Sequence, residues 1–323
     1  MKRSVLLSVF ICVHLWAFLL LSCGSKPTDP RTAVPADALV YLETKDLGGV
    51  LKAITDNEAF KNAAKSVPDF SALNGMKLSV AVTGFQTSEE AVSDENAVLN
   101  FKPRFVAVVE TNAWSYQALS FTENKLGEFI NEIYDGEIEL VTSDKHGGKY
   151  FTWTANDGRK AFALVRGSLV LFGNDESAID SCVNVMNGGA DSILKNGTVS
   201  AFASDAPASG YVSKDGVAQI ANITGVSLAV GAGEEAEVKS FIARVLPEIV
   251  RNSVTEVTWS SKRLEQGGIE DSYTVSVDKE TAKVLSETIV PGNDPDPDLS
   301  RFIPDVFVST TRYNLKDSQI AWR

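Results

Sequence analysis

Four aspartates near the C-terminal end of the chain have the residue type and the spacing of a cation site. They are Asp294, Asp296, Asp298 and Asp305. Counted from the first of them, they occupy positions 1, 3, 5 and 12, where a calcium-binding loop places oxygen ligands. Such a loop needs glycine at position 6 and a bidentate glutamate at position 12, but position 6 is Leu299 and two prolines stiffen the segment. We interpret the segment as a stiff acidic linker, with weak calcium binding as the alternative.

His146 and Ser192 could take part in hydrolysis if other groups were placed beside them. Ser192 and Lys195 have the Ser-x-x-Lys spacing of penicillin-interacting serine enzymes, but no Lys-Thr-Gly follows. His146 lies in a glycine-rich turn, and a histidine-based triad would need a serine and an acid beside that turn. The sequence has neither a Gly-x-Ser-x-Gly elbow nor a histidine-rich metal pattern. We therefore interpret His146 as an exposed turn residue.

The stretch Gly231–Ala236 matches the Gly-x-Gly-x-x-Ala pattern of a dinucleotide-binding turn. It follows an apolar segment, residues 226–230, that we expect to be a strand, and it opens a helix. However, Glu234 and Glu235 would face the pyrophosphate, whereas a helix N-terminus binds phosphate by attracting negative charge. An ordinary turn into a helix explains the stretch better, and the sequence predicts no cofactor.

Lys2 and Arg3 precede a mostly apolar run that ends at Leu20-Leu21-Ser22-Cys23. Two basic residues, an apolar run and a small residue before the cut form the pattern of a secretory signal. The small residue followed by cysteine resembles the lipobox of bacterial lipoproteins. This resemblance implies cleavage before Cys23 and acylation of its sulfur and its new amino group with long chains such as palmitate. Residues 1–22 are then a lipoprotein signal peptide.

Residues 4–21 could instead remain as a membrane-spanning helix. These 18 residues lie at the lower limit of the length that a bilayer core needs. Ser8, His14 and the serine-cysteine ending favour the lipoprotein signal. Acyl chains contribute about 0.8 kcal/mol per buried CH₂ group, and more than one chain makes the attachment stable. We expect a body that is anchored to a membrane through Cys23 without crossing it.

Residues 23–34 are rich in small, polar and charged residues and show no apolar period. Such a composition predicts a flexible tether that reaches on the order of 20 Å by coil statistics. The folded body then begins at Pro35-Ala36-Asp37, just before the apolar run 38–43.

Cys182 is the cysteine that remains once Cys12 has been removed with the signal and Cys23 has been acylated. No disulfide can then form within the mature chain. Cys182 shares one helical face with Ile179, Val183 and Met186. This spacing predicts a buried apolar side chain, with a reactive thiol as the alternative.

The composition is that of a globular, acidic protein. Hydrophobic residues make up 44% of the 323 residues, which suffices for a real core. The formal net charge is −12, and removal of Lys2 and Arg3 with the signal would leave −14. Nucleic acid and anionic lipid headgroups are therefore not expected as partners.

The sequence predicts an α+β fold that contains a four-stranded antiparallel meander at residues 137–173. Its strands are residues 137–142, 149–154, 160–166 and 168–173, joined by turns rich in residues that tolerate positive φ. Tyr150, Phe151 and Trp153 lie on the second strand, where they would pack in the core or line a ligand groove.

Other strands are expected at 77–85, 104–111, 209–214, 254–264 and 269–277, with a polar, exposed loop at 86–100. Helices are expected at 46–54, 114–134, 175–185, 215–222, 234–251 and 279–288.

Residues 35–290 form the expected α+β body, and the acidic, proline-rich stretch 291–300 is the expected linker. After it, Pro304-Asp305 and the strand that follows repeat the pattern that opens the body. We expect residues 301–323 to start a second repeat unit that is interrupted at Arg323. The alternative is that this strand and helix complete the sheet of the body.

From the Pro35-Ala36-Asp37 opening with Val40-Tyr41-Leu42 through the 160–174 hairpin, the chain resembles a family of uncharacterised bacterial envelope lipoproteins. These proteins form a domain of unknown function, with a signal peptide or lipobox and a proline-acid-strand opening. The resemblance spans residues 35–290. It implies an envelope location and an α+β fold, and it implies no activity.

These observations predict a lipid-anchored protein of the bacterial cell envelope, periplasmic or surface-exposed, that is a non-enzymatic binding or interaction module. Its partners would be the membrane, through acylated Cys23, and a protein or small molecule, but no nucleic acid. The alternative is an envelope hydrolase with a site made only of carboxylates. A pocket of convergent acids with raised pKa would favour the enzyme, and an exposed apolar patch would favour the binding module.

Overall fold

The computed structural model describes residues 28–56, 70–93, 96–134, 136–231, 236–264 and 269–289. The chain divides into two compact units. Unit 1 takes in the described residues up to Gly216 together with Thr258–Thr274, and unit 2 takes in Val217–Val257 and the described residues from Val275. The signal peptide, Cys23, the linker 291–300 and the second repeat unit 301–323 lie outside the described residues, so these predictions stay predictions.

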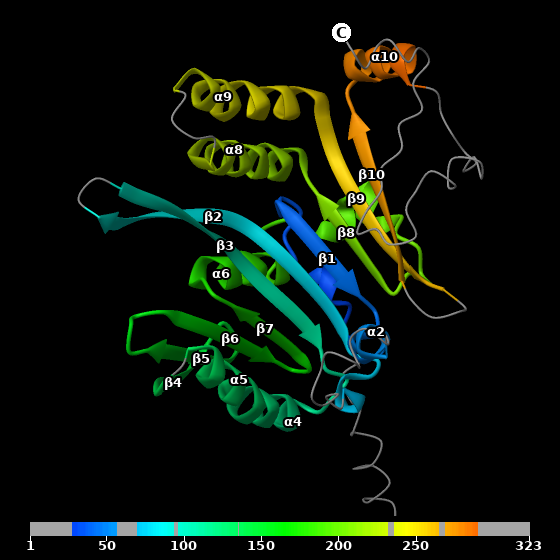
Figure 1. Ribbon diagram of the computed structural model, residues 1–323. Coiled ribbons are helices and arrows are strands. Elements are labelled where there is room, and N and C mark those ends of the chain that lie inside the picture. The colour runs from blue at the N-terminus through cyan, green and yellow to red at the C-terminus, as the bar shows by residue number, and fades with distance from the viewer. Residues whose placement is uncertain are drawn as a thin grey trace, which may run out of the picture. The chain divides into compact units, whose positions relative to one another are not determined.

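The fold is α+β, as predicted, and is built on a ten-stranded antiparallel sheet (Figure 1). The strand order is β10-β9-β8-β1-β2-β3-β7-β6-β5-β4. The bounds of the strands are β1 Val40–Thr44, β2 Lys77–Ser93, β3 Asn96–Glu110, β4 Ile138–Lys145, β5 Gly148–Ala155, β6 Lys160–Arg166, β7 Leu169–Gly173, β8 Ala208–Val212, β9 Val254–Arg263 and β10 Ile269–Val277.

Strands β4 to β7 form the predicted meander, and each strand pairs antiparallel with the next. Its turns contain residues in the left-handed region, namely His146, Gly147, Gly158 and Gly167. The glycine-rich turns were therefore a correct guide to this part of the sheet.

The loop predicted at 86–100 is wrong, because β2 and β3 continue through most of it as one long hairpin. Gln86 pairs with Lys102, and Ala91 pairs with Ala97. Ladder hydrogen bonds satisfy the backbone of a strand whether or not its side chains are apolar. The polar composition of this stretch therefore predicted exposure but not the absence of a strand.

The core of unit 1 lies on both faces of the sheet. Tyr150 belongs to one buried cluster, with Tyr41, Leu164, Leu171 and Ile179. Phe151 and Trp153 belong to a second cluster, because successive side chains of a strand point to opposite faces. The first face is covered by α6 (Glu176–Met186). The second face is covered by the helix that was predicted at 114–134. In the structure this helix consists of α4 (Ser115–Ser120), a π-helical segment (Phe121–Leu126) and α5 (Gly127–Ile133). The aromatic side chains of β5 are core residues.

Cys182 lies on the buried face of α6, as its spacing predicted. The helix begins after Asp175, whose side chain accepts a hydrogen bond from the backbone N–H of Ser177. Burial raises the pKa of the Cys182 thiol to about 12. At neutral pH the side chain is a protonated, apolar core group.

Residues 28–34 pack against the sheet, so the predicted tether 23–34 is corrected from Thr28 onwards. We call this segment the strap. It contains the 3-10 turn Pro30–Thr32, and its last two residues, Ala33 and Val34, are 0% exposed. Polar residues dominate the composition of the strap, but this apolar pair helps to fix it, because burying the pair removes apolar surface from water.

The ends of several strands lie beside the strap, and we call this edge of unit 1 the strap end. In the sheet register Thr44 pairs with Leu78 and with Ala208, and Lys77 pairs with Glu110. Helix α2 (Leu47–Thr55) follows β1 here, after Asp46, whose carboxylate accepts from the backbone N–H groups of Gly49 and Gly75.

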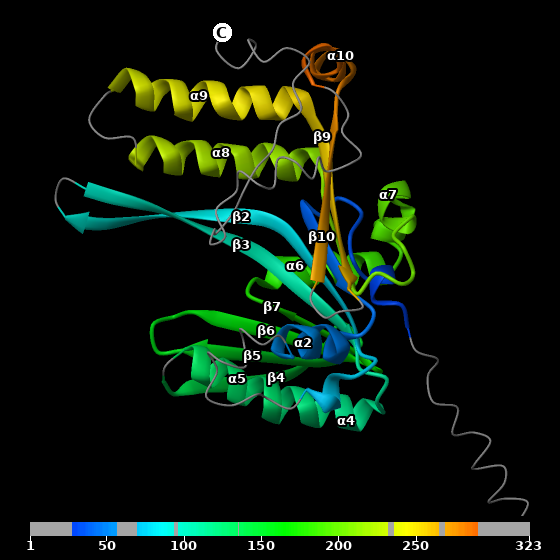
Figure 2. The same ribbon diagram turned by 45° about the vertical axis from the view of Figure 1, so that its right-hand side comes forward.

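Unit 2 is helical over most of its described length. Helices α8 (Lys214–Gly231) and α9 (Ala236–Ser253) lie side by side (Figure 2), and α10 (Lys279–Thr288) follows β10. A Cβ atom added at Gly225 of α8 would lie 2.6 Å from Cγ of Pro247 in α9, so the two helices approach closely where Gly225 lacks a side chain.

The helix predicted at 215–222 and the strand predicted at 226–230 are one helix, α8. The β-branched residues of 226–230 favoured a strand. The helix continues because the close contact with α9 stabilises it, and tertiary packing overrides a weak local preference. In the described part of the chain, no helix combines the length and the apolar character that a membrane crossing requires.

Candidate functional site

The predicted lipidation site, Cys23, and the possible calcium ligands Asp294, Asp296, Asp298 and Asp305 lie outside the described residues. Within the described residues, no three His, Cys, Asp or Glu side chains are arranged to hold a metal ion. The Gly231–Ala236 stretch lacks the context of a dinucleotide site, because Gly231 ends helix α8 rather than following a strand. Three features of the described residues remain: a histidine cluster, a buried polar network at the strap end and an apolar helix face.

His146 is half-buried, not exposed as predicted, because its turn packs against α6. Its side chain is 23% exposed, and Nε2 lies 3.0 Å from Oδ1 of Asp180. Its ring packs edge-on against Tyr150, with 6.1 Å between the ring centroids. The sequence could not reveal this arrangement, because the aspartate follows 34 positions later on a separate element.

The residues around His146 tie the β4–β5 turn to α6. Nζ of Lys145 lies 2.5 Å from Oε1 of Glu176 and 4.9 Å from the centroid of the Tyr150 ring. The hydrogen bond from Lys145 lowers the pKa of Glu176. Burial, and then the charges of Glu176 and Asp180, raise the pKa of Tyr150 well above its ordinary value. A tyrosine that keeps its proton is not a nucleophile at neutral pH. The contacts of this cluster hold the β4–β5 turn against α6.

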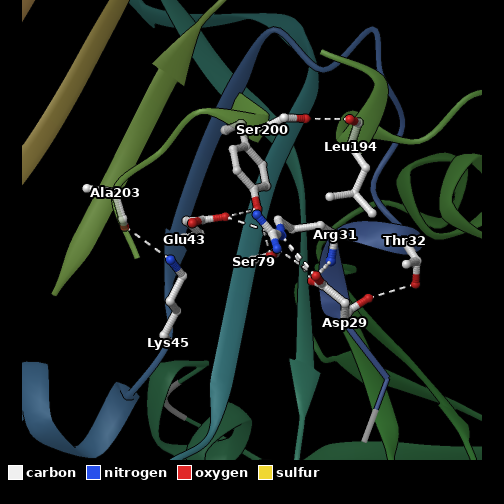
Figure 3. A network of polar contacts seen from close by, with 10 residues as sticks. Asp29, Arg31, Thr32, Glu43, Lys45, Ser79, Leu194, Ser200 and Ala203 are labelled. Atoms are coloured by element: carbon white, nitrogen blue, oxygen red, sulfur yellow. Dashed lines mark hydrogen bonds and ion pairs between the residues drawn. The ribbon is translucent and has the colours of Figure 1, made fainter. Parts of the chain in front are cut away.

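The buried polar network at the strap end joins the strap to β1 and β2 (Figure 3). The Tyr41 hydroxyl donates to Oε2 of Glu43 over 2.8 Å and lies 2.9 Å from Oγ of Ser79. Arg31 reaches the network from the strap, with Nε 3.9 Å from the same Glu43 oxygen, and it forms a bidentate pair with Asp29 through Nε to Oδ1 and Nη2 to Oδ2. A buried carboxylate needs such donors, because burial of an unpaired charge is costly.

The titration of this network reflects its burial and its charges. Burial, followed by the nearby charge of Glu43, raises the pKa of Tyr41 far above its ordinary value. For Asp29, burial alone would raise the pKa, but the hydrogen bonds and charge of Arg31 bring it below its ordinary value. The ionised forms of Asp29 and Arg31 stabilise each other within the strap, and Arg31 also brings its charge close to Glu43 of β1.

Glu110, at the end of β3, is the second acidic group that holds the strap, and its side chain is fully buried. Its Oε2 accepts from the backbone N–H of Thr28 over 2.8 Å and from the hydroxyl of Ser168 over 3.0 Å. Its Oε1 accepts from the backbone N–H of Asn112 over 2.9 Å. In the sequence Glu110 resembles an ordinary polar residue at a strand end, and its two distant donors give no local signal.

A small recess opens beside this network and has a volume of about 60 Å³. It is lined by Asp29, Arg31, Glu43, Thr44, Lys45, Lys77, Leu78 and Ser79. Ligand pockets usually hold about 300–1,000 Å³, so the recess is too small for an ordinary metabolite. Its acids and bases pair mainly with each other, and the network fixes the strap.

Helix α9 presents an apolar row that stays exposed in the described part of the chain. Val238, Phe241, Val245 and Ile249 follow one another at spacings of three and four, which places them on one helix face. Their exposed fractions are 40%, 60%, 37% and 54%. The spacing is visible in the sequence, although it does not show which of two apolar faces of α9 packs against α8.

A groove of about 750 Å³ runs beside this row. It is lined by Asn222, Ala243, Arg244, Val245, Pro247, Glu248, Ile249, Asn252 and Ser253. Its one carboxylate, Glu248, is paired with Arg251. The groove therefore combines an apolar edge with neutral polar groups and the cation of Arg244, and its lining contains no pair of acids.

Among the described residues, the carboxyl groups with a displaced pKa are displaced downward. They are Asp29, Asp46, Asp157, Glu176 and Asp278. A general acid built from a carboxyl group needs a raised pKa so that it still carries its proton near neutral pH. These five groups are stabilised as carboxylates instead.

No protein-family model matches the chain, and no curated protein matches it. A solved structure described as "Structure of crystal form III of TP0453" is similar over 82% of this chain and 90% of that chain. The two are 12% identical, and the TM-score is 0.38. A similarity at this level does not indicate a shared function.

Proposed function

We propose that the chain is a lipid-anchored protein of the bacterial cell envelope, one of the uncharacterised envelope lipoproteins that it resembles. It acts as a non-enzymatic binding module, attached to the membrane through acylated Cys23. Its binding surface is the apolar row of α9, and its partner is an envelope protein that offers an apolar surface of its own.

The observation that carries this proposal is the exposure of Val238, Phe241, Val245 and Ile249 on one helix face. Their exposed fractions together equal about two whole side chains, and covering them would contribute about 3–6 kcal/mol. That is enough to anchor an interface once other contacts offset the entropy that association loses. Contiguous exposed apolar side chains on the surface of a protein mark interaction sites.

The alternative function, a hydrolase with a carboxylate-only site, has less support. Such an enzyme needs one carboxyl group with a raised pKa and a second one near it. The five displaced carboxyl groups all have lowered pKa values, and the groove beside α9 holds a single, paired glutamate.

The test is site-specific photo-crosslinking in intact cells, with the crosslinker placed at Phe241. The matched control is Tyr116 on α4, an aromatic residue that is 68% exposed. We expect a discrete protein adduct from position 241 that disappears when Ile249→Asp is added, and no such adduct from position 116. Equal crosslinking at both positions, or an adduct that survives Ile249→Asp, would contradict the proposal, and adducts to lipid alone would make the membrane the partner.

The lipid anchor has its own test. Cys23→Ser should abolish the incorporation of labelled fatty acid and release the protein into the soluble fraction, because the acyl chains would be the sole attachment. If the variant stays on the membrane as the wild type does, residues 4–21 are a transmembrane helix instead.

A further inference from the structure

We propose that the strap end of unit 1 is held against the lipid headgroups by a leash of only four residues. This inference rests on the proposed anchor at Cys23. It goes further, because it assigns the face of the protein that meets the bilayer. The docking surface consists of the strap and the neighbouring ends of β1 and β2, and its partner is a lipid surface.

The strap is fixed at both of its ends. At its start, the backbone N–H of Thr28 donates to the buried carboxylate of Glu110. At its end, the carbonyl of Val34 accepts from the backbone N–H of Ile193 over 2.8 Å. Between these points Arg31 contacts Asp29 and Glu43. The body of the protein therefore begins at Thr28, seven positions earlier than the sequence suggested.

The length of the leash follows from the sequence. Residues 24–27 separate Cys23 from Thr28, and five extended Cα–Cα steps span at most about 18 Å. A tether that continued to Pro35 would span up to about 42 Å. The docked strap thus shortens the maximum span of the tether by more than half, and it keeps Thr28 within about 18 Å of the acylated cysteine.

The sheet register shows which groups this short leash brings to the membrane. Lys77 starts β2 opposite Glu110, so it lies at the strap end. Lys102 lies on β3 eight residues from Glu110, which places it about 27 Å along the strand from that end. Both lysines are exposed. An orientation imposed by the leash would hold Lys77 near the headgroups and Lys102 away from them.

The charges at the strap end suit a lipid surface better than the net charge of the whole chain does. Glu110 is buried and bonded, Glu43 accepts from Tyr41, and Asp29 is paired with Arg31. Lys77, by contrast, is exposed at the rim of the recess. The headgroup phosphates would therefore meet an ammonium group at an edge whose carboxylates are engaged within the protein, although the chain as a whole carries −12.

The test measures the depth of two labels on the acylated mature chain, which begins at Cys23, in phosphatidylcholine vesicles. Lys77→Cys and Lys102→Cys each carry a fluorophore, and a few of the lipids carry a nitroxide on the headgroup. Cys182 is buried, so it does not compete for the label. We expect strong quenching at position 77 and little at position 102.

A second variant has about twelve Gly and Ser residues inserted between Pro27 and Thr28, which more than doubles the maximum extended span of the leash. This insertion should abolish the difference between the two labels. The same insertion between Gly188 and Gly189, in the turn after α6, should leave the difference unchanged. Equal quenching at both positions on vesicle-bound protein, or no effect of the longer leash, would overturn the orientation alone. Protein that fails to float with the vesicles would overturn the anchor and the orientation with it.

Discussion

Glu110→Ala is the substitution that tests most directly how the strap is held. It removes a fully buried carboxylate that accepts three hydrogen bonds. The donors that lose their acceptor are the backbone N–H groups of Thr28 and Asn112 and the hydroxyl of Ser168. The Ser168 hydroxyl is buried, so water cannot readily replace the lost partner.

The expected cost follows from these three bonds. A hydrogen bond to a charged group contributes about 1.5–3 kcal/mol, but removal of Glu110 also ends the cost of burying its charge. We therefore expect Glu110→Ala to lower the free energy of unfolding by about 3–5 kcal/mol. Glu110→Gln keeps one acceptor oxygen and should cost about half as much. Glu139→Ala, at an exposed glutamate of β4, should change stability by less than about 0.5 kcal/mol.

Two assays on the Cys23→Ser chain separate global from local effects. Urea unfolding followed by tryptophan fluorescence reports on unit 1, because Trp153 lies in its core. Limited trypsin digestion reports on the strap, because Arg31 is cleaved only when the strap leaves the sheet. Loss of the Thr28 bond should speed cleavage at Arg31 by about tenfold or more, since 1.4 kcal/mol corresponds to a factor of ten. If Glu110→Ala costs less than about 1 kcal/mol, or if cleavage at Arg31 keeps its wild-type rate, Glu110 does not hold the strap.

Two further substitutions test the packing of α8 and the core. Gly225→Ala should destabilise the α8–α9 pair by about 1–3 kcal/mol in a thermal melt, because its Cβ would lie 2.6 Å from Cγ of Pro247. The control Gly197→Ala should leave the melt unchanged, because no atom lies within 4 Å of its new Cβ. The free energy of unfolding should fall as the pH rises from about 9 to 12, because the pKa of Cys182 is near its ordinary value of 9.0 in the unfolded chain but about 12 in the folded chain. Cys182→Ala should flatten this part of the pH profile, and an unchanged slope would show that the thiol is not protected by burial.

The elements that local patterns specify could be predicted from the sequence. The turns of the meander at residues 137–173 place glycine or histidine at positive φ, and this signal acts within a few residues, whereas β6 is buried on both faces and shows no alternation. The buried position of Cys182 followed in the same way from helical spacing. These predictions succeeded because the cause of each structure lies in the segment itself.

The features that the sequence did not predict depend on contacts with residues far away in the chain. Glu110 is buried because its donors come from residues 82 and 58 positions away, and the strap is fixed because Ala33 and Val34 find a place in the core. Helix α8 continues past Gly225 because Pro247 of the next helix packs against it. Composition correctly described each of these segments as polar or β-branched, but it could not show what would pack against them.

On the proposed anchor at Cys23, Glu110 would help to set how far the body can move from the membrane, and this link can be measured in vesicles. When the strap is docked, the leash from Cys23 ends at Thr28 and spans at most about 18 Å. When the strap detaches, the leash runs to Pro35 and spans up to about 42 Å. Glu110→Ala should consequently weaken the quenching of a label at Lys77 on acylated protein, and Glu139→Ala should not. If Glu110→Ala frees the strap to trypsin yet leaves the quenching unchanged, contacts of the strap end with the lipid, rather than the length of the leash, set the orientation.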